Sequence, residues 1–180
     1  MKTVIKFLEH DLLPSYIDHL HKHLGESGMD DVIYSPYEIG FIHPKDKMQK
    51  KVQERFSTPL NKISWQRAFV TVDHNHIIGH LDLQGHDIES SLHRCRLGMG
   101  LDKEYRFKGL GSHLMKEAIA WITNSTEIDW IDLYTFEHNK SAIALYQKFG
   151  FEVVGKVDDL FRVSGHKICD YQMTLKIKRA

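Results

Sequence analysis

The stretch Leu97–Trp121, LGMGLDKEYRFKGLGSHLMKEAIAW, constrains the fold more than any other part of the chain. It predicts a strand, then a basic turn containing Gly109 and Gly111, then an amphipathic helix. The apolar residues on one face of that helix are Leu110, Leu114, Ala118 and Ile122. The first N–H groups of a helix have no partner within the helix, and the helix dipole adds positive potential there. The stretch therefore predicts an anion-binding site at the start of the helix.

The segments around this stretch predict a mixed sheet. Apolar alternation predicts strands at residues 3–8, 65–72, 77–83, 92–101, 128–136, 151–157 and 167–177, with a turn or bulge in 158–165. Helical periodicity predicts further helices at 11–25, 44–56 and 139–149. The strand–helix–strand portion in the middle requires a parallel crossover. We therefore expect one α/β (mixed α+β) domain over residues 1–180, with helices on the faces of its sheet.

Composition excludes several function classes. Lys+Arg and Asp+Glu balance at 24 each, so no net field attracts nucleic acid or an anionic membrane. No run of about 18 apolar residues predicts a membrane span, and the start, MKTVIKFLEHDLL, lacks the uninterrupted apolar core of a secretory signal. With only Cys95 and Cys169, we expect reduced thiols and a cytoplasmic location.

Thirteen histidines are more than a chain of this length usually has. His19 and His23 would share a helix face, with His21 nearby, and a second loose group contains His74, His76 and His80. A metal site needs a third or fourth ligand at a suitable spacing, and none is evident. We therefore predict solvated or hydrogen-bonded imidazoles and no metal site.

The turn itself has the form R-x-x-G-x-G, from Arg106 to Gly111. Its two glycines let the backbone approach a ligand closely, successive N–H groups form a concave anion receptor, and Arg106 and Lys108 add positive charge. The chain contains no Walker G-x-x-x-x-G-K-[ST] string, and Lys103 stands where a Rossmann motif starting at Gly98 requires glycine. The glycines alone are also compatible with plain turn chemistry.

A second motif makes the first more specific. The segment that starts at Asn139, NKSAIALYQKFGF, has the form N-x-x-A-x-x-L-Y-x-x-x-G-F. Together with R-x-x-G-x-G, in this order and with a helix and a strand between them, it resembles the GNAT N-acetyltransferases. Their pyrophosphate motif is written [QR]-x-x-G-x-[GA]. The resemblance is sharp over residues 92–154 and looser over the first 90 residues.

The resemblance implies a fold and a reaction. The fold is a GNAT-like, mostly antiparallel seven-stranded sheet with helices on both faces and a splayed parallel strand pair, here the strands that end at Leu101 and Phe136. The reaction moves an acetyl group from acetyl-CoA to a primary amine of a small molecule, amino acid or peptide by direct attack in a ternary complex. A non-catalytic acyl-CoA-binding or sensing module of the same fold is the alternative. A homodimer is compatible with the resemblance, and nucleic-acid or membrane partners are not expected.

The resemblance also implies residue roles. The Leu101 N–H would bind the thioester oxygen, and the Met99 backbone would bind the pantetheine arm. The pyrophosphate would be held by Arg106 and by the N–H groups of Phe107, Lys108, Gly109, Leu110, Gly111 and Ser112. Asn139 would contact the cofactor, or serve only as a helix N-cap. Tyr146 would be the general acid towards the CoA sulfur, or only a core aromatic.

The chain departs from the family pattern at two positions. Phe107 replaces the glycine that often follows the arginine of the turn. Tyr134 stands where protein N-terminal acetyltransferases of this family have a glutamate, so the general base stays open among the candidates Asp82, His80, Asp132 and His138.

The acceptor is not identified by any motif. The expected helix at 44–56 has a basic face, which is either solvated or a wall for an acidic or phosphorylated ligand. That face contains Lys45, Lys47, Lys50, Lys51 and Arg55.

Overall fold

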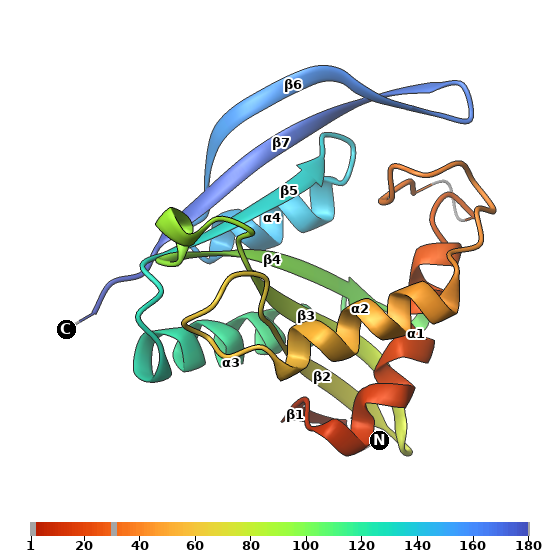
Figure 1. The fold of residues 1–180 in the computed structure, drawn as a ribbon. Helices are drawn as coiled ribbons and strands as arrows, with labels where there is room; N and C mark the ends of the chain where they lie inside the picture. The colour runs from red at the N-terminus through yellow and green to blue at the C-terminus, as the bar shows by residue number, and fades with distance from the viewer. Residues whose placement is uncertain (1–2, 30–31, 180) are drawn as a thin grey trace.

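A computed structural model describes residues 3–29 and 32–179, and these form one seven-stranded sheet in the order β1-β2-β3-β4-β5-β7-β6 (Figure 1). Neighbouring strands are antiparallel except β4 and β5, which are parallel. The predicted fold class is confirmed. The strands are β1 (Val4–Phe7), β2 (Gln66–Asp73), β3 (His76–Gly85), β4 (Arg94–Leu101), β5 (Trp130–Phe136), β6 (Glu152–Val163) and β7 (His166–Lys176).

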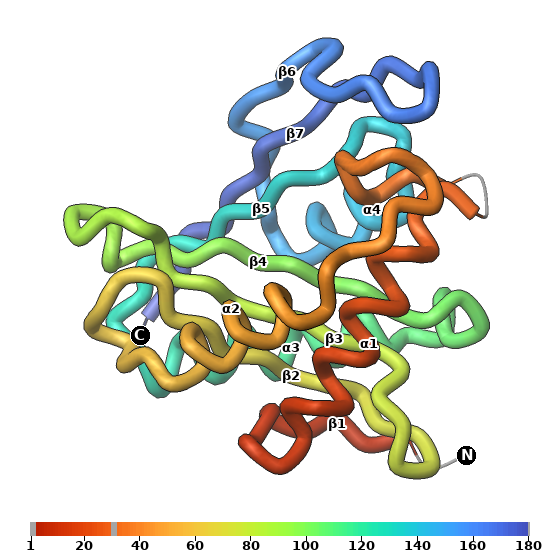
Figure 2. Tube along the Cα trace, turned by 45° about the vertical axis from the view of Figure 1, so that its right-hand side comes forward, coloured from red at the N-terminus to blue at the C-terminus, as the bar shows by residue number. Residues whose placement is uncertain are grey.

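Helices cover both faces of the sheet. On one face lie α1 (Leu13–Gly25) and α2 (Lys45–Ser57), and on the other lie α3 (Leu110–Ser125) and α4 (Lys140–Lys148) (Figures 1 and 2). Short 3₁₀ turns stand at His10–Leu12, Glu89–Ser91 and Lys103–Tyr105. None of the helices in the described residues is long and apolar enough to cross a membrane.

Strand alternation gives each face its own core, because successive side chains point to opposite sides of a sheet. Leu81 and Leu83 of β3 pack with α3 and α4 in the larger core, which also includes Tyr146. Ala68 and Val70 of β2 pack with α1 and α2 in the second core. His80 and Asp82 of β3 pair with Val70 and Ala68 of β2 and so share the α1/α2 face, where polar side chains therefore enter the sheet surface.

The parallel pair opens along its length. β4 and β5 pair only where Arg94–Arg96 lies beside Trp130–Asp132, and beyond these residues the two strands separate (Figure 1). β4 continues along β3 as far as Leu101, while β5 continues along β7 as far as Phe136. Each strand thus keeps one partner, and its other edge is left open to form a slot.

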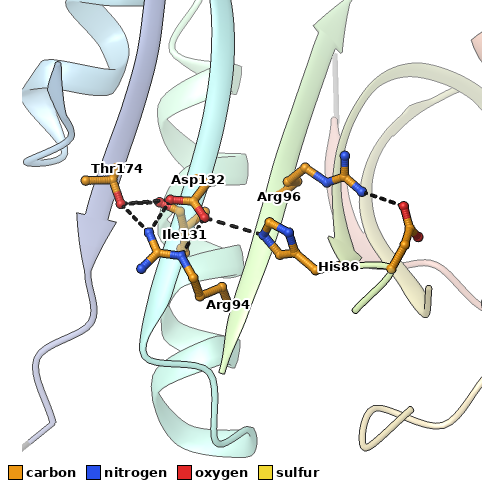
Figure 3. A network of polar contacts seen from close by, with 7 residues as sticks. His86, Arg94, Arg96, Ile131, Asp132 and Thr174 are labelled. Carbon is orange, nitrogen blue, oxygen red and sulfur yellow. Dashed lines mark hydrogen bonds and ion pairs between the residues drawn. The ribbon is translucent and has the colours of Figure 1, made fainter. Parts of the chain in front are cut away.

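A polar network fixes the closed end of this slot (Figure 3). Arg94 donates from Nε to Asp132 Oδ2 at 2.8 Å and from Nη2 to Asp132 Oδ1 at 2.5 Å, and Thr174 donates to Oδ1 at 2.9 Å. His86 Nε2 lies 3.5 Å from Asp132 Oδ2. Burial raises the pKa of Asp132, but the bonds from Arg94 and Thr174 outweigh it and lower that pKa overall.

The C-terminal hairpin is longer than the sequence predicts. The segment 158–165, where a turn or bulge is expected, contains both. The register between β6 and β7 is irregular between Val157 and Phe161, and a turn follows at Ser164 and Gly165, so β6 continues to Val163. Asp159, inside the irregularity, has a φ of 52°. A bulge of this kind interrupts the alternation pattern without ending the strand, which is why local periodicity places the strand end too early.

Candidate functional site

A cavity of about 1330 Å³ lies over the slot between β4 and β5. Its walls come from five places in the chain: β4, the turn before α3, α4, the end of β5 with β7, and the α1/α2 face. Its lining includes the following residues proposed from the sequence: Met99, Leu101, Arg106, Phe107, Gly109, Gly111, Ser112, Asn139 and Tyr146. The fold therefore brings both sequence motifs to one cavity.

At the end of β4, two backbone N–H groups face this cavity. Asp102 N–H donates to Ile78 of β3 at 2.9 Å. Because N–H groups alternate sides along an antiparallel strand, those of Leu101 and Met99 face away from β3, towards the slot. The Leu101 carbonyl faces the same way and accepts a bond from Arg106 Nε at 3.0 Å. The edge of β4 thus offers unpaired backbone donors beside the cavity, as an acyl-binding slot requires.

The turn before α3 has the geometry of an anion receptor. Gly109 is the N-cap residue with a φ of 82°, and Phe107 has a φ of 61°. The His113 N–H donates to the Gly109 carbonyl at 3.1 Å, so the N–H groups of residues 110–112 precede the first helical bond. A Cβ on Gly111 would lie 3.1 Å from Leu145 of α4, so this glycine permits close packing between the two motifs.

Not every side chain of the turn faces the cavity. Arg106 lines the cavity and reaches towards the β4 terminus, with its guanidinium 5.8 Å from the Tyr34 ring centroid. The Lys108 ammonium lies 5.3 Å from the Tyr105 ring centroid, and Lys108 and Leu110 are outside the cavity lining. Phe107 is 88% exposed at the cavity rim. Towards an anion bound at this turn, Lys108 and Leu110 would therefore offer only their backbone N–H groups. The Lys108 ammonium would add a positive charge at longer range.

Tyr146 belongs both to the core and to the cavity. Its ring is buried against Phe151, with centroids 5.8 Å apart, and it also lines the cavity. Burial, with a contribution from the nearby charge of Asp82, raises the pKa of Tyr146 to about 12. The phenol is therefore protonated at neutral pH and able to donate a hydrogen bond.

Asn139 is the N-cap residue of α4, but its side chain does not cap the helix. Instead, the Ser141 hydroxyl donates to Asn139 Oδ1 at 3.3 Å, and both residues line the cavity. The Asn139 side chain therefore does not act as the helix cap that the sequence left open. Its amide is available to a ligand.

The structure separates the candidate bases. Asp132 is bound by Arg94 at the closed end of the slot, and His138 Nε2 lies 2.7 Å from the Ile33 carbonyl. Asp82 and His80 line the cavity, as does the half-exposed Tyr134. Among residues 3–29 and 32–179, no group of three or more His, Cys, Asp or Glu side chains is arranged to hold a metal ion.

Several cavity residues were not identified from the sequence. His23 and Tyr34 come from α1 and the loop after it, Gln66 and Gln84 from β2 and β3, and Asp170 from β7. Burial raises the pKa of Asp170 to about 6. The only sequence signal for any of these was the histidine spacing, because His19 and His23 were expected on one helix face.

Comparisons with known proteins agree with this geometry. Residues 35–151 match the model of the Acetyltransferase (GNAT) family. L-amino acid N-acetyltransferase AaaT of Escherichia coli is 30% identical over 113 residues, which are 63% of this chain and 65% of that protein. Spermine/spermidine N(1)-acetyltransferase of Bacillus subtilis is 40% identical over 58 residues, 32% of this chain and 38% of that protein. The chain thus aligns with less than two thirds of either relative.

A solved structure shows the same fold. The phosphinothricin acetyltransferase of Sinorhizobium meliloti, solved in complex with AcCoA, superposes with a TM-score of 0.80 at 15% identity, covering 98% of this chain and 89% of that one. The family model covers well over half of the chain, and it spans both motifs that meet in the cavity. The chain therefore belongs to the Acetyltransferase (GNAT) family.

Proposed function

We propose that this protein transfers an acetyl group from acetyl-CoA to a primary amine by direct attack in a ternary complex. The observation that carries the proposal is the meeting of the β4 edge, the Arg106–Ser112 turn and Tyr146 in one cavity. The turn would hold the pyrophosphate on its N–H groups and at the N-terminus of α3. The Met99 backbone would hold the pantetheine arm in the slot, and Asn139 would bind the cofactor from α4.

The chemistry would then proceed at the open end of the slot. The amine nitrogen attacks the thioester carbon, and the oxygen that gains negative charge binds the Leu101 N–H, a donor worth about 3 kcal/mol in other acyl transfers. As the C–S bond breaks, its electron pair goes to sulfur. The Tyr146 phenol donates a hydrogen bond to that sulfur, and full proton transfer is slow because its pKa lies above that of a thiol.

The charge of the cavity favours one class of acceptor. Lys47, Lys51 and Arg55 of α2 line the cavity on the side of the α1/α2 face. A polyamine carries several positive charges and would be repelled there, whereas the carboxylate of an amino acid would be attracted. The relative named as an L-amino acid acetyltransferase supports the same class. We therefore propose an amine that also bears an anionic group, such as an α-amino acid.

An assay of free CoA thiol tests this proposal. The protein is incubated with acetyl-CoA and a panel of L-amino acids, with spermine and a neutral primary amine as comparison substrates, and acetyl-CoA binding is measured by calorimetry. We expect acetyl-CoA to bind at micromolar concentration and kcat/KM to be at least tenfold higher for an amino acid. Acetyl-CoA binding without thiol release from any amine would instead support the non-catalytic acyl-CoA-binding alternative. A preference for spermine would overturn the acceptor class alone.

A further inference from the structure

The two histidine groups of the sequence meet inside the fold. His19 of α1 and His80 of β3 share a hydrogen bond of 2.9 Å between Nε2 and Nδ1. On its other side, His19 Nδ1 lies 3.4 Å from Asp102 Oδ1, and His80 Nε2 lies 3.8 Å from Asp82 Oδ1. All four residues are buried, with exposures of 4 to 6%. They form a line, Asp82–His80–His19–Asp102, in which each ring nitrogen faces the next group. We call this line the histidine relay.

The two ends of the histidine relay lie in different surroundings. Asp82 lines the cavity. Asp102, just after β4, binds the ammonium of Lys22 through Oδ2 at 2.8 Å, and the Lys22 side chain is half exposed. The relay therefore leads from the cavity to Asp102, which is buried itself but bound to a half-exposed lysine of α1.

Asp82 is held in place with one oxygen towards β4. Its Oδ2 accepts from Gln84 Nε2 at 2.6 Å and lies 3.4 Å from Gln66 Nε2. Its Oδ1 lies directly over Gly98, where an added Cβ would come within 2.7 Å of it. The absence of a side chain at Gly98 thus lets the carboxyl lie above β4, beside the slot, and its charge is close enough to raise the pKa of Tyr146.

A proton has to leave this cavity in every turnover. An acceptor that arrives as R–NH₃⁺ reacts as R–NH₃⁺ + CH₃CO–S–CoA → R–NH–COCH₃ + HS–CoA + H⁺. The nitrogen must give up two protons in total, of which one ends on the CoA thiol and one goes to solvent. The reaction therefore needs a base near the nitrogen and a path to solvent for that second proton.

We propose that Asp82 accepts the proton from the acceptor nitrogen and that His80 and His19 pass it to Asp102, which is bound to the half-exposed ammonium of Lys22. This assignment rests on the proposed acetyl transfer. His80 takes the proton on Nε2 and releases the one on Nδ1 to His19, which in turn releases its own to Asp102. The 3.8 Å gap between His80 and Asp82 is longer than a hydrogen bond, and the 3.4 Å contact between His19 Nδ1 and Asp102 Oδ1 does not have hydrogen-bond geometry. Both carboxyl groups therefore have to move for transfer.

The electrostatics of the groups around the relay suit this role. Burial lowers the pKa of both His19 and His80, so each ring is neutral at pH 7 and has one donor and one acceptor nitrogen. Burial raises the pKa of Asp82, which makes its carboxylate a stronger base, while Gln84 and Arg55 act in the opposite direction. The remaining neighbours of the His19 ring are His23, the Lys22 ammonium and the Ile77 backbone.

Asp170 is the rival base. It lines the same cavity, is also buried, and has a pKa raised to about 6. It belongs to β7, opposite Phe136 at the end of β5, and has no place in the histidine relay. Asp82 is favoured because it lies over β4 and because a proton on it has a path outward.

Two aspartate variants compare these candidates in the thiol-release assay, once the wild type shows turnover. We expect Asp82→Asn to lower kcat/KM about 100-fold or more at pH 7.5, in line with the loss of a general base. The rival variant Asp170→Asn should retain at least tenfold more activity than Asp82→Asn, and acetyl-CoA affinity should be unchanged in Asp82→Asn. A large loss in Asp170→Asn with none in Asp82→Asn would overturn the assignment. Lack of turnover in the wild type would instead reject the proposed function itself.

The path outward is tested by chemical rescue. In His80→Gln, exit of the proton should limit turnover, so kcat should fall at least tenfold and rise again as imidazole buffer is increased at constant pH and ionic strength. Wild-type kcat should not depend on buffer concentration. Asp102→Asn, at the outer end, should show the same buffer dependence even if His80→Gln folds poorly. A lower kcat that no buffer restores in either variant would show that these residues are only structural.

Discussion

At the scale of single residues, Tyr146 has a position that is compatible with both roles that the sequence offered as alternatives. Its ring fills the core between α4 and the sheet, and the same residue also lines the cavity. Packing fixes the ring, so the hydroxyl is aimed without the entropy cost of ordering a mobile side chain at the moment of reaction. Burial also keeps the phenol protonated, since its pKa is about 12.

Replacing Tyr146 by phenylalanine keeps the ring and removes only the hydroxyl. We expect kcat to fall about 10- to 100-fold, because one hydrogen bond to the leaving sulfur is lost, while the Kd for acetyl-CoA changes less than threefold. Steady-state kinetics and calorimetry measure the two quantities. Tyr171→Phe is the matched control: it loses a 3.1 Å bond to Glu137 outside the cavity lining and should keep wild-type kcat. Equal rates in Tyr146→Phe and wild type, with chemistry limiting, would reject the acid role.

At the scale of elements, the strand–turn–helix unit β4–α3 supplies most of the proposed cofactor site. The open edge of β4 gives backbone donors, and the start of α3 gives N–H groups and the positive end of a dipole. The turn between them needs a left-handed residue at the N-cap, and Gly109 takes that conformation without strain. The β4–α3 unit thus offers hydrogen-bond donors from its backbone. For binding an anion, the geometry of the turn therefore matters more than the identity of most of its side chains.

Gly109→Ala tests that geometry. A Cβ at a φ of 82° costs about 1 kcal/mol or more in stability, and a shift of the turn to relieve it would misplace the N–H groups. We expect Kd for acetyl-CoA to rise at least tenfold by calorimetry. Gly165→Ala, in the β6–β7 turn at a φ of 84°, has the same backbone strain and equally open space for its Cβ. It should lose similar stability in thermal unfolding and bind acetyl-CoA normally; a parallel loss of affinity in both variants would contradict the role of the turn.

At the scale of the whole molecule, the α1/α2 layer is attached to the sheet partly through histidines. His23 stacks on the Tyr34 ring with centroids 4.7 Å apart, and its Nε2 lies where a Cβ on Gly100 would come within 2.3 Å. Burial, then the charges of His19 and Arg106, lower the pKa of His23 to about 4. In the unfolded chain its pKa would be near 6.5. Between pH 6.5 and 4 the unfolded state therefore binds more protons, so His23 stabilises the fold above pH 6.5 and this contribution is lost on acidification.

His23→Gln should reduce the acid sensitivity of the whole fold. One proton taken up only on unfolding changes the free energy of unfolding by about 1.4 kcal/mol per pH unit, which gives up to about 3 kcal/mol between pH 6.5 and 4. We expect the drop in unfolding free energy from pH 7 to pH 4.5, measured with urea, to be about 2 kcal/mol smaller in the variant. His166→Gln, at the start of β7, controls for the loss of an exposed histidine. Parallel drops in wild type and His23→Gln would show that His23 is not buried in its neutral form.

Local patterns were sufficient for the cofactor half of the site. Hydrophobic periodicity placed α3 and β5 close to their observed bounds, and the two motifs around Gly109 and Tyr146 were read directly from residue spacing. These features were predictable because a helix start, a glycine turn and an amphipathic face are each determined by residues close together in the sequence. The β6 irregularity was less predictable, because a bulge is stabilised by the partner strand.

The acceptor half of the site was decided only by tertiary structure. Asp82 and Asp132 were equal candidates in the sequence, and long-range strand pairing separated them: Asp132 meets Arg94 at the closed end of the slot, while Asp82 lies over Gly98 in the cavity. The contact between His19 and His80 joins residues 61 positions apart. The sequence by itself thus determined the turn and helix of the proposed donor site. Burial and distant partners, which no local spacing encodes, decided which side chains face the acceptor.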